Sequence, residues 1–217
     1  MERIVIFDLD DTLVHSSAVR EAFASVARER GIAVTLMSRA LDTLPGRPAQ
    51  DIFEALGCDA GEAQAATERF LACLDDLNGH LPTVAYEDAD ATLRELAARG
   101  STLVLSTGSS PERAQQVLEQ EGWEFEVVLG STDACRKGPA HYEQVAATAP
   151  DGGWTRRAIT VGDSPADMRF GAEHGVPVRI GIDRDGDPRP LYDAGATHVV
   201  SALADVVSIV ASVRIAA

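Results

Sequence analysis

The feature that most constrains the fold is an alternation of short apolar runs with stretches of helical periodicity, which begins near Tyr86. Strands are predicted at 102–106, 126–129, 158–161, 177–181 and 197–200. Helices are predicted at 87–99, 111–121, 139–148, 165–174 and 202–212. Such alternation is typical of α/β proteins, in which right-handed crossovers join the strands of a parallel sheet. The apolar run at residues 4–7 adds a strand buried on both faces.

The segment from residue 15 to residue 83 interrupts this alternation, because it has helical patterns and no strand pattern. Its helices are predicted at 17–30, 35–43, 48–56 and 60–77. We therefore expect an α/β core made of residues 1–14 and 84–217, and an all-helical domain at 15–83. The linkers near 13–17 and 80–85 predict a hinge between the two.

Composition limits the classes of partner. The chain is 45% hydrophobic and 24% charged, as soluble globular proteins are. No stretch approaches the roughly 20 apolar residues of a membrane span, and no signal-peptide pattern opens the sequence, so we expect a cytoplasmic protein. The net charge of -15 disfavours nucleic acid and anionic membranes as partners.

Three carboxylates crowd the end of the first predicted strand, in the sequence Asp-Leu-Asp-Asp-Thr at residues 8–12. Ligands of open α/β sheets bind beyond the carboxyl ends of the strands, and a hard cation such as Mg2+ would relieve the repulsion. Asp163 follows another predicted strand and is expected at the same sheet edge as Asp8. The structural alternatives are an acidic turn with Asp11 or Thr12 as helix N-cap, and a tight turn before an N-capped helix.

An anion site is predicted just after the strand at 102–106. Thr107 offers a hydroxyl and Gly108 permits close approach of a backbone N–H, before a helix that starts near Pro111. Such a helix start is a ready anion site. The alternative is an ordinary glycine-rich turn.

The lysine content points to one further residue. The chain has 18 arginines and a single lysine, Lys137. A compact ammonium suits a crowded site that binds phosphate and carboxylate as a point charge, whereas the guanidinium fork is larger. Alternatively, Lys137 and its neighbour Arg136 form an ordinary basic turn.

Four patterns, in this order, resemble the motifs of the haloacid dehalogenase superfamily. Residues 8–12 resemble motif I, Asp-x-Asp-x-Thr after an apolar strand, and residues 103–107 resemble motif II, a strand that ends in Ser or Thr. Lys137 stands where motif III places its lysine, and residues 159–167 resemble motif IV. The resemblance covers nearly the whole chain. It implies a Rossmann-like parallel sheet sandwiched by helices, with residues 15–83 as a helical cap.

The resemblance also implies roles for the site residues. Asp8 is expected to be the nucleophile and Asp10 the general acid and base, a residue that phosphatases and phosphomutases of the family carry and its dehalogenases lack. Mg2+ is expected to bind the carboxylates of Asp8 and Asp163 and the backbone carbonyl of Asp10. Asp167 is expected to hydrogen-bond metal-bound water or Lys137. The expected phosphate-binding residues are Thr107, Gly108 and Lys137.

Two residues are candidates for substrate specificity. Arg47 lies in the loop Leu-Pro-Gly-Arg-Pro of the helical segment, where family members often present a substrate-contacting loop. It would bind a carboxylate or a second phosphate, or it is a solvated arginine. His15 follows motif I and is either a substrate contact or a polar linker residue.

These features predict a Mg2+-dependent phosphatase that hydrolyses a small soluble phosphomonoester through an aspartyl-phosphate intermediate. Phosphoglycolate phosphatase-like enzymes are the closest resemblance within the family. One alternative is a phosphomutase similar to β-phosphoglucomutase, which returns the phosphoryl group to a sugar. Another is a module that binds a phosphorylated ligand without catalysis.

Overall fold

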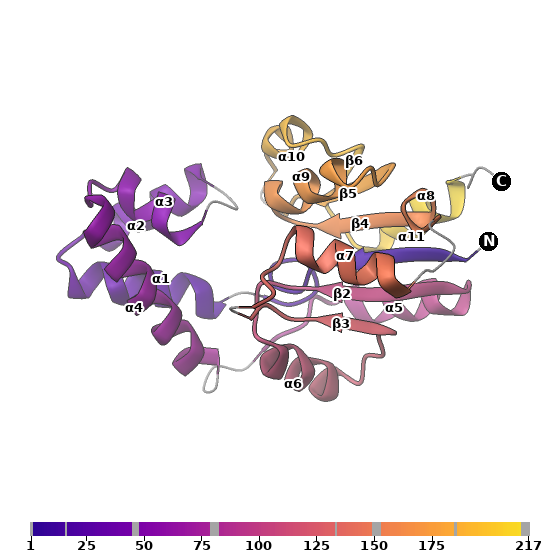
Figure 1. Ribbon diagram of the computed structural model, residues 1–217, viewed down its shortest axis with the longest axis horizontal. Helices are drawn as coiled ribbons and strands as arrows, with labels where there is room; N and C mark the ends of the chain where they lie inside the picture. The colour runs from indigo at the N-terminus through magenta and orange to yellow at the C-terminus, as the bar shows by residue number, and fades with distance from the viewer. Residues whose placement is uncertain are drawn as a thin grey trace. The chain divides into compact units, whose positions relative to one another are not determined.

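The computed structural model (Figure 1) describes residues 2–15, 17–44, 48–78, 83–132, 134–148, 153–184 and 186–213. The chain forms two compact units, one made of Met1–His15 with Val84–Ala217 and the other of Ser16–Thr83. We call them the core unit and the helical unit. Over the described ranges, no helix is both long and apolar enough to cross a membrane.

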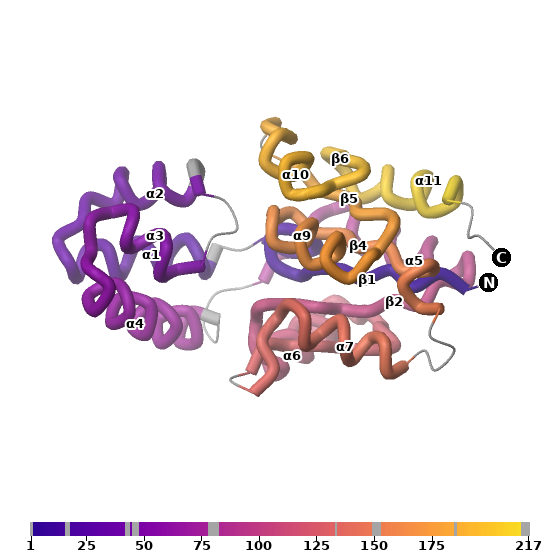
Figure 2. Tube along the Cα trace, turned by 45° about the horizontal axis from the view of Figure 1, so that its top comes forward, coloured from indigo at the N-terminus to yellow at the C-terminus, as the bar shows by residue number. Residues whose placement is uncertain are grey.

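The core unit contains a six-stranded parallel sheet. Its strands are β1 (Arg3–Phe7), β2 (Ser101–Ser106), β3 (Val127–Leu129), β4 (Ala158–Gly162), β5 (Val178–Ile182) and β6 (His198–Val200). Their spatial order is β3-β2-β1-β4-β5-β6, and all neighbouring strands are parallel. The direction of winding reverses between β1 and β4, which lie side by side (Figure 2). The predicted α/β fold is confirmed, and such a reversal favours a ligand site at the carboxyl ends of these two strands.

Helices cover both faces of the sheet. On one face, α5 (Ala89–Ala98), α6 (Pro111–Glu121) and α11 (Ala204–Ser212) share a hydrophobic cluster with Val5 and Phe7 of β1. On the other face, α7 (Pro139–Thr148), α8 (Trp154–Arg157) and α9 (Pro165–Glu173) pack with Ile4 and Ile6. Successive residues of β1 thus enter opposite clusters, which explains the uninterrupted apolar run.

Two short helices of the core unit are absent from the predictions, α8 and α10 (Arg189–Asp193). Each spans about one helical turn, which is too short for a helical repeat of apolar residues to show. All the helices and strands predicted for the core unit are present, and their ends differ from the predicted ends by at most two residues.

The helical unit consists of α1 (Ser17–Glu29), α2 (Val34–Thr43), α3 (Ala49–Ala55) and α4 (Ala60–Asn78). It has a hydrophobic cluster of its own. Within that cluster the ring centroid of Phe23 lies 4.1 Å from that of Phe70 and 5.6 Å from that of Phe53. This separate core lets the unit be stable around its own apolar side chains rather than those of the sheet.

The chain segments that lead into and out of the helical unit are hydrogen-bonded to each other inside the core unit. Val14 and Ala85 form an antiparallel bridge. The backbone N–H of His15 donates to the carbonyl of Val84 at 2.8 Å, and that of Tyr86 donates to the carbonyl of residue 13 at 3.0 Å. His15, the first residue of the predicted helical domain, therefore lies in the core unit.

Candidate active site

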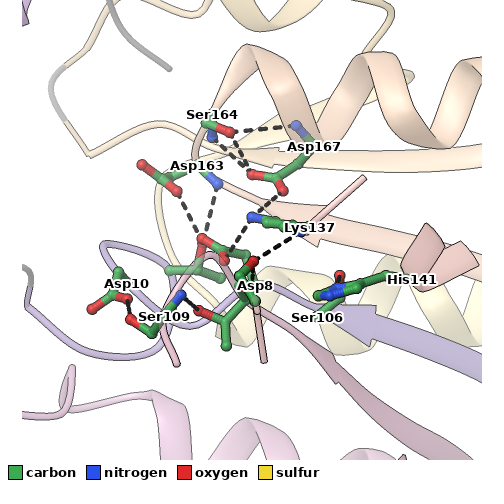
Figure 3. A network of polar contacts seen from close by, with 12 residues as sticks. Asp8, Asp10, Ser106, Ser109, Lys137, His141, Asp163, Ser164 and Asp167 are labelled. Carbon is green, nitrogen blue, oxygen red and sulfur yellow. Dashed lines mark hydrogen bonds and ion pairs between the residues drawn. The ribbon is translucent and has the colours of Figure 1, made fainter. Parts of the chain in front are cut away.

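The carboxyl ends of β1 and β4 bring two distant parts of the sequence together (Figure 3). Asp8 follows β1, and its backbone N–H donates to the carbonyl of Val161 at 2.9 Å. The Thr12 hydroxyl lies 3.2 Å from Oδ1 of Asp163 and 3.4 Å from Oδ2 of Asp8, and it accepts the backbone N–H of Asp163 at 3.1 Å. Thr12 therefore ties the strand-end acids of β1 and β4 together rather than capping a helix.

Lys137 lies between two carboxylates. Its Nζ is 2.7 Å from Oδ1 of Asp8 and 2.6 Å from Oδ1 of Asp167 (Figure 3). Burial alone would lower the pKa of Lys137, but Asp167 and Asp8 outweigh it and raise that pKa. The single lysine of the chain is therefore a permanent positive charge at the end of β1, and not part of an ordinary exposed turn.

Three carboxylates converge at this point. Asp8, Asp163 and Asp167 each offer an oxygen, and these oxygens lie within 4.8 Å of one another. Burial raises the pKa of Asp8 to about 7, against the attraction of Lys137 and with the repulsion of Asp167. Burial, followed by repulsion from Asp8 and Asp167, also raises the pKa of Asp163 well above its ordinary value. One ammonium therefore does not balance the negative charge of this cluster.

The donor set fits a hard divalent cation. Carboxylate oxygens are preferred ligands of Mg2+, and a divalent ion supplies the positive charge that the three acids lack. Asp167 is the least available of the three, because its Oδ1 faces Lys137 and its Oδ2 accepts the hydroxyl of Ser164 at 2.7 Å. The carboxylates best placed to hold such an ion are those of Asp8 and Asp163.

The start of α9 holds Asp167 in place. Ser164 and Asp167 form a capping box, in which each side chain accepts a hydrogen bond from the backbone N–H of the other. Gly162 leaves room for this arrangement, since a Cβ there would lie 2.4 Å from Oδ2 of Asp167. The sequence leaves open whether these residues cap a helix or form an acidic site. In the structure they do both.

The loop between β2 and α6 carries the predicted anion site. Thr107 is buried, its backbone N–H donates to the carbonyl of Leu129 at 2.9 Å, and its hydroxyl accepts the N–H of Ser109 at 3.0 Å. Gly108 is exposed, and no atom lies within 4 Å of the position that a Cβ would take. The loop therefore has open space beside Gly108, directly before the N-terminus of α6.

Asp10 is held through both of its carboxylate oxygens. The hydroxyl of Ser109 donates to Oδ2 at 2.6 Å, and Nη2 of Arg113 lies 2.9 Å from Oδ1. Neither partner is among the residues that the sequence predicts. The sequence does contain a sign that Arg113 has a charged partner. Arg113 shares the buried face of α6 with Ala114 and Val117, where an arginine is rare unless its charge is paired.

Ser131 joins the two loops on either side of the predicted phosphate site, and the sequence patterns do not predict it either. Its hydroxyl donates to the carbonyl of Thr107 at 3.1 Å and accepts the backbone N–H of Lys137 at 2.8 Å. Its own N–H donates to the carbonyl of Ser109 at 2.8 Å. A serine after a strand has no distinctive sequence signal, so only the folded chain reveals this link.

One of the two specificity candidates, His15, lies against an aromatic ring. The ring of His15 stacks on Tyr86 with the centroids 3.9 Å apart, and the guanidinium carbon of Arg184 lies 3.4 Å from the centroid of the same Tyr86 ring. Arg47 lies outside the described residues. Substrate contact by His15 and Arg47 stays a prediction.

The chain is similar to known proteins over most of its length. Residues 2–175 match the family of haloacid dehalogenase-like hydrolases. A phosphoglycolate phosphatase of Rhodospirillum rubrum is 34% identical, over 92% of this chain and 87% of its own, and one of Caulobacter vibrioides is 28% identical, over 93% and 88%. The solved structure of a haloacid dehalogenase-like hydrolase from Streptococcus pneumoniae has a TM-score of 0.78 at 19% identity, covering 96% of this chain and 98% of its own.

Proposed function

Because the chain belongs to the haloacid dehalogenase-like hydrolases and is a phosphoric monoester hydrolase, we propose that it hydrolyses a small soluble phosphomonoester through an aspartyl phosphate on Asp8. Phosphoglycolate is the first candidate substrate, because the relatives that match most of the chain carry the name phosphoglycolate phosphatase. The observation that carries the proposal is the buried Asp8 carboxylate at the end of β1, 2.7 Å from the ammonium of Lys137.

In the first displacement, a carboxylate oxygen of Asp8 attacks phosphorus and forms an acyl phosphate. The bond between phosphorus and the leaving oxygen breaks, and that oxygen takes the electron pair and a proton from Asp10. Lys137 and the Thr107 hydroxyl are the groups that meet the phosphoryl oxygens. Lys137 offsets their charge, and the N-terminus of α6 adds backbone N–H groups and a favourable dipole.

In the second displacement, water attacks the phosphorus of the acyl phosphate. Asp10, now ionised, takes a proton from that water, the bond to the Asp8 oxygen breaks, and inorganic phosphate leaves. The carboxylate of Asp8 is thereby restored. A second acid near the nucleophile is what distinguishes this reaction from attack by Asp8 on a carbon, which needs no proton at the leaving group.

The ion that fits this site is Mg2+, which the carboxylates of Asp8 and Asp163 and the backbone carbonyl of Asp10 would hold. When bound, it would neutralise negative charge on the phosphoryl group and keep Asp8 ionised. Asp167 acts through its contact with Lys137, whose Nζ it holds at 2.6 Å.

Phosphate release across a panel of metabolite phosphates, 2-phosphoglycolate included, tests the proposal, with Mg2+ or EDTA in parallel. We expect release that depends on Mg2+ and that continues without a bisphosphate primer, which a phosphomutase would require. Borohydride reduces an acyl phosphate to an alcohol, so quenching during turnover should convert Asp8 to homoserine in a mass-mapped peptide. Turnover by the Asp8→Asn variant at the wild-type rate would show that the nucleophile is assigned wrongly.

A further inference from the structure

The contacts of Asp10 define a small, partly buried group of residues beside the site. Arg113 is only 8% exposed, and its Nη2 lies 2.9 Å from Oδ1 of Asp10. The hydroxyl of Ser109 approaches the other oxygen, Oδ2, at 2.6 Å. Over the described residues, Asp10 is the one carboxylate within ion-pair distance of Arg113. A buried guanidinium is costly without an opposite charge, so this carboxylate is what makes its burial tolerable.

The position of Arg113 is fixed by the start of α6. Ser110 caps the helix by accepting the backbone N–H of Arg113 at 3.3 Å, and Pro111 occupies the first turn. Gly130, just after β3, lets this turn approach closely, because a Cβ there would lie 2.5 Å from the Pro111 nitrogen. The guanidinium therefore extends toward Asp10 from a backbone that is packed against the sheet.

Two contacts on different oxygens restrict both side-chain torsions of Asp10. Arg113 meets Oδ1 as an ion pair without a hydrogen bond, and Oδ1 is buried. Ser109 engages one of the lone pairs of Oδ2. With Oδ1 buried against Arg113, Oδ2 is the oxygen that remains for a proton or for substrate. A general acid must lie within hydrogen-bond reach of the leaving oxygen, and small misplacements are expensive in rate.

We propose that Arg113, together with Ser109, is a positioning residue for the acid–base step, and that it holds the Asp10 carboxylate at the orientation from which it reaches the leaving-group oxygen. This inference rests on the proposed function, because it takes Asp10 as the general acid. It assigns Arg113 no contact with the substrate.

The test compares two esters that differ in their need for a proton. An alkyl phosphate from the panel requires general acid catalysis, whereas 2,4-dinitrophenyl phosphate releases a stable anion without it. We measure kcat/KM, which reports the first displacement and leaves out hydrolysis of the acyl phosphate. For Arg113→Met we expect a fall of about 10- to 100-fold on the alkyl ester and of less than about 3-fold on the dinitrophenyl ester.

Further variants sharpen the test. Asp10→Asn should show the same dependence on the leaving group, with a larger loss on the alkyl ester. Arg113→Lys should recover part of that loss because it keeps the charge, and Ser109→Ala should give a weaker version of it. Arg94→Met, which changes an exposed arginine on α5 paired with Asp90, is the matched control and should leave both esters unaffected.

Equal losses on both esters for Arg113→Met and Ser109→Ala would overturn the inference. They would show that the two residues stabilise the loop as a whole rather than orient Asp10. A crystal structure of Arg113→Met gives a readout that does not depend on turnover. A displaced Asp10 carboxylate supports the inference, whereas an unchanged orientation against Ser109 refutes it. Absence of turnover on either ester by the wild-type protein would instead count against the proposed function, and the crystal structure would still decide the role of Arg113.

Discussion

The raised pKa of Asp8 leads to a prediction about stability that runs against the usual effect of changing a buried residue. In metal-free protein at pH 8, the Asp8→Asn variant should be more stable than the wild type. Burial, opposed by Lys137 and reinforced by Asp167, raises the pKa of Asp8 from 3.8 to about 7. Asparagine resembles the neutral carboxyl in shape and removes the cost of a buried negative charge.

The sign follows from proton linkage. The folded state holds the Asp8 proton more tightly than the unfolded state, so the stability that this group contributes is complete below pH 3.8. That contribution is lost as the pH rises from 3.8 to about 7, because the unfolded chain ionises first. The difference between the two pKa values corresponds to about 4 kcal/mol above pH 7. Coupling to neighbouring acids reduces the expected gain for the variant to about 2–4 kcal/mol.

Calorimetric melts in EDTA at pH 8 and pH 5 measure this gain. For a chain of this length 1 kcal/mol shifts Tm by about 2–4 °C, so Asp8→Asn should melt about 5–15 °C higher than the wild type at pH 8. The difference should shrink to less than half at pH 5. Added Mg2+ should raise the Tm of the wild type more than that of the variant, because an amide is a weaker ligand than a carboxylate.

The control is Glu143→Gln, which neutralises an exposed acid on α7 and should change Tm little at either pH. A lower Tm for Asp8→Asn than for the wild type at pH 8 in EDTA would refute the reasoning. It would mean that the ion pair of Asp8 with Lys137 stabilises the fold by more than the burial of the charge costs.

Substitutions at three further positions test the supports of the site. Gly162→Ala should lower the free energy of unfolding by about 1–3 kcal/mol and should also lower turnover, because the added Cβ would lie 2.4 Å from an oxygen of Asp167. Urea unfolding measures the first effect and phosphate release the second. Asp11 has a φ of 58°, so Asp11→Ala should be about 1 kcal/mol less stable than Asp11→Gly, because both variants lack the carboxylate and only alanine is strained at that φ. Urea unfolding measures the difference. Ser131→Ala should lower kcat with little change in Tm, since it frees the loop that Ser131 ties to the carbonyl of Thr107.

The part of the fold that could be predicted is the part encoded in periodic patterns. The apolar run of β1 and the alternation after Tyr86 each specify a local structure, and parallel strands leave few ways to combine them. Because the carboxyl ends of such strands share one edge, acids that follow β1 and β4 had to come near each other. That is why the strand pattern alone is enough to pair Asp8 with Asp163 across the sequence.

The supporting contacts could not be predicted in this way. Ser109 and Asp10 are 99 positions apart, and their hydrogen bond depends on where α6 begins relative to β1. Arg113 meets Asp10 for the same reason, and the only local sign was an arginine beside apolar neighbours. Ser131 has no local sign, because its three hydrogen bonds depend on two loops meeting. Pairwise tertiary geometry of this kind leaves no period in the sequence.

Residues 13–15 and 84–86 are hydrogen-bonded to each other, so the two ends of the inserted helical unit are joined within the core unit. In topological terms, Ser16–Thr83 is the loop of a hairpin whose stem belongs to the sheet domain. This stem fixes the places at which the inserted segment leaves and re-enters the core unit. A core unit with a short turn in place of Ser16–Thr83 therefore tests whether the sheet folds without the helical unit.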